Sequence, residues 1–458
     1  MFSVYVILAV FCILLGMFLA VHAFGTGGKR ANIFEDIYYS VEDIDGTGIL
    51  YTKSGEYSAV LRMENPVQKD SASADSYSAF LRLMTSVMQT LGEGYALHKQ
   101  DVFVRSHRSD ASSDFFDCFT YVVITQENKK SSLLSYDAAK WKDFLVKIHK
   151  VYDRLRDGGV EPRFLDVDGA RLYAERFFAL NFRDKVFSTT NFQVGSEIIG
   201  LDDRQAKVYS LVDVDSVSFS GVLRPFADVT VDGSVMPVDI MDDIDHIPDV
   251  DTVVYNQVLF LPNQKRERAL LEKKRSRHAG IPNPGYEIAV EDITKVQNAL
   301  AQDAKLLVHA HFNLIVAMDA DKNMQKVTSH LENIFARQGI RVSKQAYNQL
   351  ELFVSSFPGN CYHLNPDYDR YLTLSDAALC LMYKERQHKL KLLEKKMESE
   401  FFLDHLTDAD RAKATKLLER AEKLQRVIAD SAATEGEKQA AARRLEVAHH
   451  ELKLLCQS

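Results

Sequence analysis

The sequence predicts an α+β protein with one N-terminal transmembrane helix, a body of small mixed α/β sandwich units and a C-terminal α-helical hairpin. An uncharged apolar run near the start of the chain predicts the membrane helix. Strand-like and helix-like periodicities alternate as far as residue 386, and heptad-like spacing follows that point. The predicted divisions are an anchor and hinge at 1–30, an α+β unit at 31–165, a strand- and loop-rich unit at 166–300, a compact α/β unit at 301–386 and a helical tail at 387–458.

The overall composition is that of a folded protein. Of the 458 residues, 46% are hydrophobic and 26% are charged, which argues against a disordered or collagen-like chain. The formal net charge of −8 argues against a protein whose main task is to neutralise nucleic-acid phosphates. The 5 cysteines are scattered and form no CxxC pair. This pattern is typical of a reducing compartment and not of a secreted disulfide scaffold.

The apolar run at 4–24 contains no Asp, Glu, Lys or Arg and is long enough for a helix to cross a bilayer. A cleaved signal peptide is the competing interpretation, because Val21 and Ala23 resemble the small residues of a cleavage site. A signal peptide needs positive charge before the apolar run, however, and here Lys29 and Arg30 follow it. The positive-inside rule therefore predicts a single-pass protein whose globular part is cytoplasmic.

The first part of the body has two rounds of strands and helices. Alternating residues at 48–63 predict a β-hairpin, and apolar spacing at Ser76–Leu91 predicts an amphipathic helix. A strand at 95–105 and another at 119–126 follow, and then a helix at Ala138–Leu155. These segments lack Gly-rich turns between strand and helix, so an α+β arrangement is favoured over a doubly wound nucleotide-binding sheet.

The segment after residue 300 predicts a compact α/β unit and then the tail. The predicted elements of the unit are strands at 305–318 and 339–344 and helices at Lys322–Arg337, Gln345–Phe353 and Ser375–Tyr383. In the tail, an apolar stripe within Asp408–Asp430 and a second one from Ala441 predict two helices. We expect this hairpin to offer a surface for self-association at 408–456.

Two charged segments stand out. Six aspartates lie between Asp239 and Asp251, but they lack the offsets, central Gly and terminal Glu of a calcium loop, so a solvated acidic loop is expected. A predicted helix follows, and its basic residues are Lys265, Arg266, Arg268, Lys273, Lys274, Arg275 and Arg277. Such a run is most often a solvated helix face, and contact with nucleic acid or anionic lipid is the alternative.

The sequence predicts no catalytic, cofactor-binding or metal-binding residue. The phosphate-binding pattern GxxxxGK[ST] is absent. His309 and His311 would share one face of a strand but have no accompanying second ligand pair, so buried or edge histidines are expected. Cys361 and His363 are too close in sequence to indicate a thiol nucleophile, and Asp319 is interpreted as the end of an apolar strand.

Several long strings carry a resemblance to a known family. They are YSVEDIDGTGILYTKSGEYSAVLRMENPVQK (39–69), TLGEGYALHKQDVFVR (90–105), ITQENKK (124–130), SYDAAKWKDFLVKI (135–148), PDVDTVVYNQVLFLPNQKRE (248–267), AYNQLELFVSSFPGNCY (346–362) and LTLSDAALCLMYKER (372–386). In these strings residues 31–386 resemble the amino-terminal region of TraG, the ATPase of conjugative transposons that is similar to the motor of type IV secretion. The chain departs from the family in being shorter between Arg105 and Phe119.

The resemblance implies a docking or scaffold component of a conjugative type IV secretion system in the bacterial inner membrane, with inner-membrane secretion components as partners. The family continues beyond this region into a P-loop ATPase domain, whereas the residues after Arg386 predict the helical hairpin. We therefore expect no ATPase activity and no cofactor for the chain alone. Two alternatives stay open, one half of a split ATPase completed in trans by a P-loop subunit, and a DNA-contacting adaptor that uses residues 265–277.

Overall fold

The computed structural model divides into two compact units, Met1–Arg386 and Gln387–Ser458, and the helices and strands below belong to the first. The residues that it describes are 30–69, 72–106, 115–128, 138–183, 186–211, 223–231, 234–280, 283–302, 305–337, 340–343 and 348–386, together with 413 and 416. The hairpin expected at 408–456 lies outside these residues except at Lys413 and Lys416.

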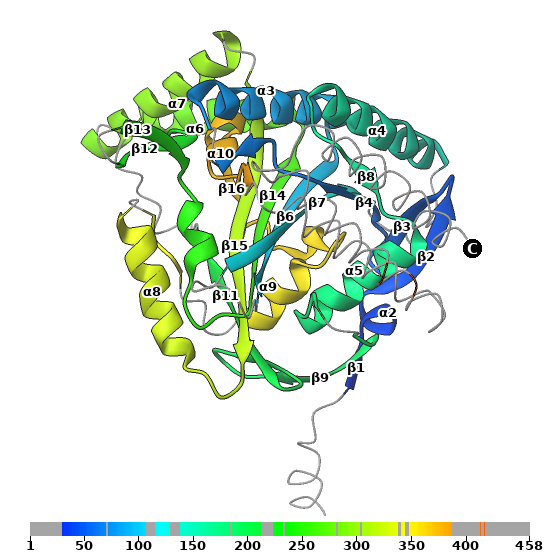
Figure 1. The fold of residues 1–458 in the computed structure, drawn as a ribbon. Coiled ribbons are helices and arrows are strands. Elements are labelled where there is room, and N and C mark those ends of the chain that lie inside the picture. The colour runs from blue at the N-terminus through cyan, green and yellow to red at the C-terminus, as the bar shows by residue number, and fades with distance from the viewer. Residues whose placement is uncertain are drawn as a thin grey trace, which may run out of the picture. The chain divides into compact units, whose positions relative to one another are not determined.

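A 13-stranded antiparallel sheet forms the centre of the first unit (Figure 1). Its main path runs in the order β1 (Arg30–Asn32), β9 (Thr189–Val194), β10 (Ile199–Leu201), β11 (Arg204–Ser210), β15 (Leu307–Asp319), β14 (Thr252–Leu261), β6 (Tyr95–Ser106), β7 (Phe115–Gln126), β4 (Tyr57–Met63), β3 (Thr47–Thr52) and β2 (Tyr38–Ile44). β16 (Tyr371–Leu374) also pairs with β15, and β8 (Arg163–Phe164) pairs with β4. Two small sheets pair β12 (Phe226–Val231) with β13 (Ser234–Asp239) and β5 (Val67–Gln68) with β17 (Glu385–Arg386).

The mixed α+β class is as predicted, but the expectation of several small sandwich units is wrong. β14, from the segment 166–300, lies between β6 of the segment 31–165 and β15 of the segment 301–386. Every residue of β14 is buried. Such a strand needs a neighbour at each edge and cover on each face, so the three predicted units share one continuous sheet.

Helices cover both faces of this sheet. One face packs against α3 (Ala74–Leu91), α4 (Ala138–Asp157), α8 (Met324–Arg337) and α10 (Ser375–Cys380). The other face meets α5 (Val167–Ala179) and α9 (Gln349–Ser355). The remaining helical segments are α2 (Ile33–Asp36), α6 (Gln264–Ala279), α7 (Pro284–Gln302), η2 (Asp242–His246) and η3 (Cys361–His363).

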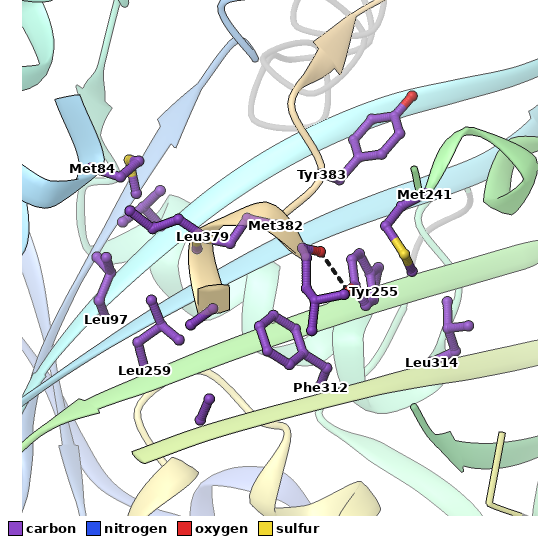
Figure 2. Close-up of a cluster of buried hydrophobic side chains, with 14 of the residues drawn as sticks. Met84, Leu97, Met241, Tyr255, Leu259, Phe312, Leu314, Leu379, Met382 and Tyr383 are labelled. Atoms are coloured by element: carbon purple, nitrogen blue, oxygen red, sulfur yellow. Dashed lines mark hydrogen bonds between the residues drawn. The ribbon is translucent and has the colours of Figure 1, made fainter. Parts of the chain in front are cut away.

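The larger hydrophobic core lies under α3 and α10 (Figure 2). Leu97, Leu259 and Phe312 from three neighbouring strands point into it, and Leu379 comes from α10 above them. The Tyr255 hydroxyl donates a hydrogen bond to the Leu381 carbonyl at 2.7 Å, which satisfies a polar atom inside this core. The sheet and the segment after α10 are therefore joined by both apolar and polar contacts.

A smaller aromatic core lies on the opposite face. Phe357 contacts Phe177 of α5 at a ring separation of 5.0 Å and Phe353 of α9 at 5.2 Å. Tyr173 stacks on Tyr121 of the sheet at 3.9 Å. Offset and edge-on ring pairs of this kind add to the free energy gained from apolar burial, so α5 and α9 are held firmly on the sheet.

The elements predicted from local periodicity are largely confirmed. The hairpin of β3 and β4 and the helices α3, α4 and α6 lie where the sequence predicts them. The helix predicted at Ser375–Tyr383 ends earlier, at Cys380, because the chain then straightens to bring residues 384–386 to their buried partners. Of the strand predicted at 339–344, the structure describes residues 340–343, among which only Ser343 forms a bridge, to Ser210.

The structure leaves the membrane helix as a prediction from sequence. Among the described residues, no helix is both long and apolar enough to cross a bilayer. The predicted span at 4–24 lies outside those residues.

Candidate functional site

Helix α6 carries the basic residues that the sequence singled out. The Asn263 side chain caps its start by accepting a hydrogen bond from the Arg266 backbone N–H at 2.8 Å. The Gln264 side chain bonds both backbone groups of Leu307 on β15, at 2.8 and 2.9 Å. No residue of α6 is buried, although the helix packs beside α7 (Figure 1). The first turn is thus fixed to the sheet, and most of the helix surface stays accessible.

The seven basic residues of α6 fall into two groups. Arg275 is partly buried and donates two hydrogen bonds to the Glu272 carboxylate, at 2.8 and 2.6 Å. Hydrogen bonds from Arg275 and Gln297 lower the pKa of Glu272 to about 2. The other six side chains are exposed and form no ion pair with a carboxylate of the described chain: Lys265, Arg266, Arg268, Lys273, Lys274 and Arg277.

A buried ion pair lies in the sheet on the face that α3 and α10 cover. Lys99 on β6 pairs with Asp101 and also donates to the Tyr383 carbonyl at 2.8 Å. Three neutral side chains donate to the same carboxylate at 2.6–2.9 Å, namely Asn65, Thr120 and Gln257. Burial lowers the pKa of Lys99. Because both carboxylate oxygens are occupied, this pair is a structural anchor and offers no free acceptor to a ligand.

A second buried cluster holds the end of the first unit, and we call it the exit clamp. It consists of Lys384, Glu385 and Arg386 with their partners Asp239, Tyr77 and Glu64. The Lys384 ammonium lies 3.1 Å from Asp239 Oδ2, and the Asp239 backbone N–H donates to Glu385 Oε1 at 2.7 Å. Burial, together with the neighbouring Asp239 and Asp242 carboxylates, raises the pKa of Glu385 to about 7.

The opposite face of the sheet carries a polar cluster without a charge. Gln100 donates to Asn256 Oδ1 at 2.7 Å and accepts a hydrogen bond from the Tyr173 hydroxyl at 2.7 Å. Burial lowers the pKa of His98, which contacts the same Asn256 oxygen, to about 4. At neutral pH this histidine is therefore uncharged, and the cluster joins α5 to the sheet.

The expectation of a solvated acidic loop is wrong for three of its aspartates. Asp239 belongs to the exit clamp, Asp242 pairs with Lys69, and Asp251 lies 3.0 Å from the Lys322 ammonium. Each stands at or near a strand or turn that brings it to a cation from another part of the chain. Among the described residues, no group of three or more His, Cys, Asp and Glu side chains could hold a metal ion.

His309 and His311 do share a face of β15, but they do not form a metal site. His311 is buried, and its two ring nitrogens are engaged by the Asp369 carbonyl at 2.7 Å and by Asn313 Nδ2 at 2.9 Å. His309 is partly exposed, 3.6 Å from Glu267. The expectation of buried or edge histidines is confirmed for this pair.

The other candidate groups also have structural roles. Burial raises the pKa of the Cys361 thiol to about 12, so its nucleophilic thiolate is scarce. His363 contacts Ser54 at 3.0 Å and not the thiol. Asp319 ends β15 as expected, and its carboxylate lies 3.1 Å from Lys322.

Sequence reasoning missed the buried ion pairs. One signal was available, because Lys99 and Asp101 lie on the same face of a predicted strand as the apolar Leu97 and Phe103. The partnership of Lys384 with Asp239 had no such signal, since the two residues are far apart in sequence.

Compared with known proteins, the chain matches no family model and no curated protein. The resemblance to TraG therefore rests on the quoted strings.

Proposed function

We propose that the chain is a membrane-anchored docking component of a conjugative type IV secretion system, similar to the non-catalytic amino-terminal part of TraG. The family strings, the apolar run at 4–24 and the organisation of the body support this proposal. The proposed partners are inner-membrane secretion components, and the proposed location is the bacterial inner membrane with the body in the cytoplasm. Self-association through 408–456 belongs to the same proposal.

One contrast carries the proposal. The charged clusters inside the body are occupied by one another, as in the pair of Lys99 with Asp101 and in the exit clamp. Helix α6, in contrast, carries six exposed cations without an ion pair to the described chain, and its first turn is fixed to the sheet. A body whose internal charges are paired and whose unpaired cations are exposed suits a protein that acts by binding partners and not by catalysis.

Co-purification tests the docking function. The full-length chain, tagged and crosslinked in membranes of a conjugation-proficient donor, should recover inner-membrane components of the secretion system, and cells lacking the chain should transfer less DNA. Recovery of none of these components from membranes that contain the chain would contradict the proposal.

The split-ATPase alternative predicts a complex with a separately encoded P-loop subunit. Mixing the two purified proteins should then raise ATP hydrolysis, and equal hydrolysis with and without the chain would remove this alternative.

A DNA-contacting adaptor is the alternative for α6 itself, favoured by the same outward cations. It predicts an affinity for duplex DNA that falls as salt is added. The slope of log affinity against log salt concentration should become shallower by about one for each phosphate-contacting cation removed.

A further inference from the structure

The outward side of α6 is a continuous basic face. At 3.6 residues per turn, Arg266, Lys273 and Arg277 lie within about 40° of one another around the helix axis. Lys265 and Lys274 flank them, and all five side chains are exposed. From Lys265 to Arg277 this face extends over about 18 Å of a helix of 16 residues. We call it the α6 basic face.

No acidic side chain of α6 weakens this face. Glu272 is occupied by Arg275 and Gln297, and Glu267 lies 3.6 Å from His309. The arc from Lys265 to Lys274 therefore holds cations and no carboxylate, whereas Arg268 lies on the opposite side of the helix, near Arg275. A purely solvated face has no need of this separation, whereas a polyanion that approaches from outside would be attracted by it.

Exposed apolar side chains occur on α6 and on the helix that packs beside it. Leu270 lies in the same arc as Lys273 and Arg277 and is 49% exposed. Ile288 of the adjacent helix α7 is 60% exposed. The boundary between headgroups and acyl chains accepts both cations and apolar side chains, while the phosphate backbone of DNA offers nothing to an apolar group.

We propose that the α6 basic face binds the anionic phospholipid headgroups of the membrane. Basic clusters of four to eight residues on a helix are typical of such binding, in which each cation near the surface strengthens the interaction. The choice of a membrane over DNA rests on the proposed membrane-anchored function, which keeps the body near a lipid surface. The contact would fix the orientation of the sheet relative to the membrane, and hence the side that the body turns toward its partners.

Vesicle partitioning of the full-length chain tests the proposal. The apolar run at 4–24 is expected to bind any vesicle, so the informative quantity is the partition coefficient for vesicles with about one third phosphatidylglycerol divided by that for phosphatidylcholine alone. We expect the triple variant R266Q/K273Q/R277Q to lower this ratio at least tenfold, since each cation contributes about fivefold. High salt should lower the wild-type ratio in the same direction.

The control variant K142Q/K150Q/R154Q removes three exposed cations from α4 and changes the net charge equally. It should keep the wild-type ratio, and circular dichroism should show both variants folded. Equal losses in the two triple variants would overturn the proposal, because general charge would then explain binding. A wild-type ratio near one would also overturn it.

Lysine acetylation gives a second measurement on the same vesicles. Phosphatidylglycerol should slow the acetylation of Lys273 and Lys274 and leave that of Lys142 and Lys150 unchanged. Equal rates on both lipids would contradict contact at α6. If R266Q/K273Q/R277Q loses affinity for duplex DNA but keeps the vesicle ratio, the face binds nucleic acid and the lipid proposal fails. Failure of the lipid proposal in the acetylation or the DNA-binding measurement would leave the docking function untouched, because docking is measured by recovery of secretion components.

Discussion

Lys384 and Asp239 form an ion pair with both side chains fully inaccessible to solvent, the ammonium 3.1 Å from Oδ2. The Lys384 backbone N–H donates to the same oxygen at 2.9 Å, and the ammonium also donates to the Cys380 carbonyl at 2.9 Å. The pair joins β13 to the last strand of the first unit, β17. Because a buried charge is tolerated only with its partner, the position of β17 depends on Asp239.

We expect Lys384→Met to destabilise the first unit by about 3–5 kcal/mol, since it leaves the Asp239 carboxylate buried without a counter-charge. The double variant K384M/D239N, which removes both charges, should recover more than half of that loss. Urea unfolding monitored by fluorescence measures both values. Lys295→Met, on an exposed side chain of α7, is the control and should keep the wild-type free energy of unfolding within experimental error. If the double variant is no more stable than Lys384→Met, the uncompensated Asp239 charge is not the cause of the lost stability.

Glu385 makes stability depend on pH. Its pKa of about 7 in the folded chain lies above the ordinary value of 4.5, so the folded state holds a proton that the unfolded state has released between these pH values. The contribution of Glu385 to the unfolding free energy is therefore present below pH 4.5 and is lost as pH rises through about 7.

Between about pH 5 and about pH 8, the free energy of unfolding of the wild type should fall by roughly 2–3 kcal/mol more than that of the variant Glu385→Gln. Urea unfolding at a series of pH values measures the difference. Glu287→Gln, at an exposed position on α7, should keep the wild-type dependence. Parallel curves for the wild type and Glu385→Gln would show that Glu385 does not titrate in this range.

Cys361 should resist alkylation in the folded protein. Burial raises the pKa of its thiol from 9.0 to about 12, which lowers the thiolate fraction at pH 8 by roughly a thousandfold, and the side chain is inaccessible. Iodoacetamide labelling followed by peptide mass spectrometry should show slow modification of this residue in buffer and rapid modification in urea. Rapid labelling of Cys361 in buffer, with the fold intact, would reopen a role for it as a nucleophile.

What could be predicted from the sequence depends on whether the signal is local. The apolar positions of α3, such as Phe80, Met84 and Val87, repeat at helical spacing and are all buried in the core. The place of β14 between β6 and β15 could not be predicted, because it depends on pairing between segments far apart in sequence. For α6 the run of charges was visible, but only the structure separates the paired Arg275 from the outward Lys273 and Arg277.

Gly359 illustrates a constraint of the same non-local kind. Its φ of +83° is one that residues with a Cβ atom rarely adopt, and a Cβ placed there would lie 2.5 Å from Ser58 Oγ of β4. Gly46 has a similar φ of +79°, but nothing lies within 4 Å of its Cβ position. A comparison of alanine substitutions at the two glycines therefore separates the cost of backbone strain from the cost of steric contact.

We expect Gly46→Ala to cost about 1 kcal/mol, from backbone strain alone. Gly359→Ala should cost about 1–3 kcal/mol more, because Ser58 is buried in the sheet and hydrogen-bonded to Thr125 at 3.0 Å, which limits its movement. Urea unfolding of the two variants measures the difference, and the double variant S58A/G359A should recover part of it. Equal costs for the two glycines would mean that the loop after α9 moves away from β4 without loss, and that its close approach to the sheet is not required by the fold.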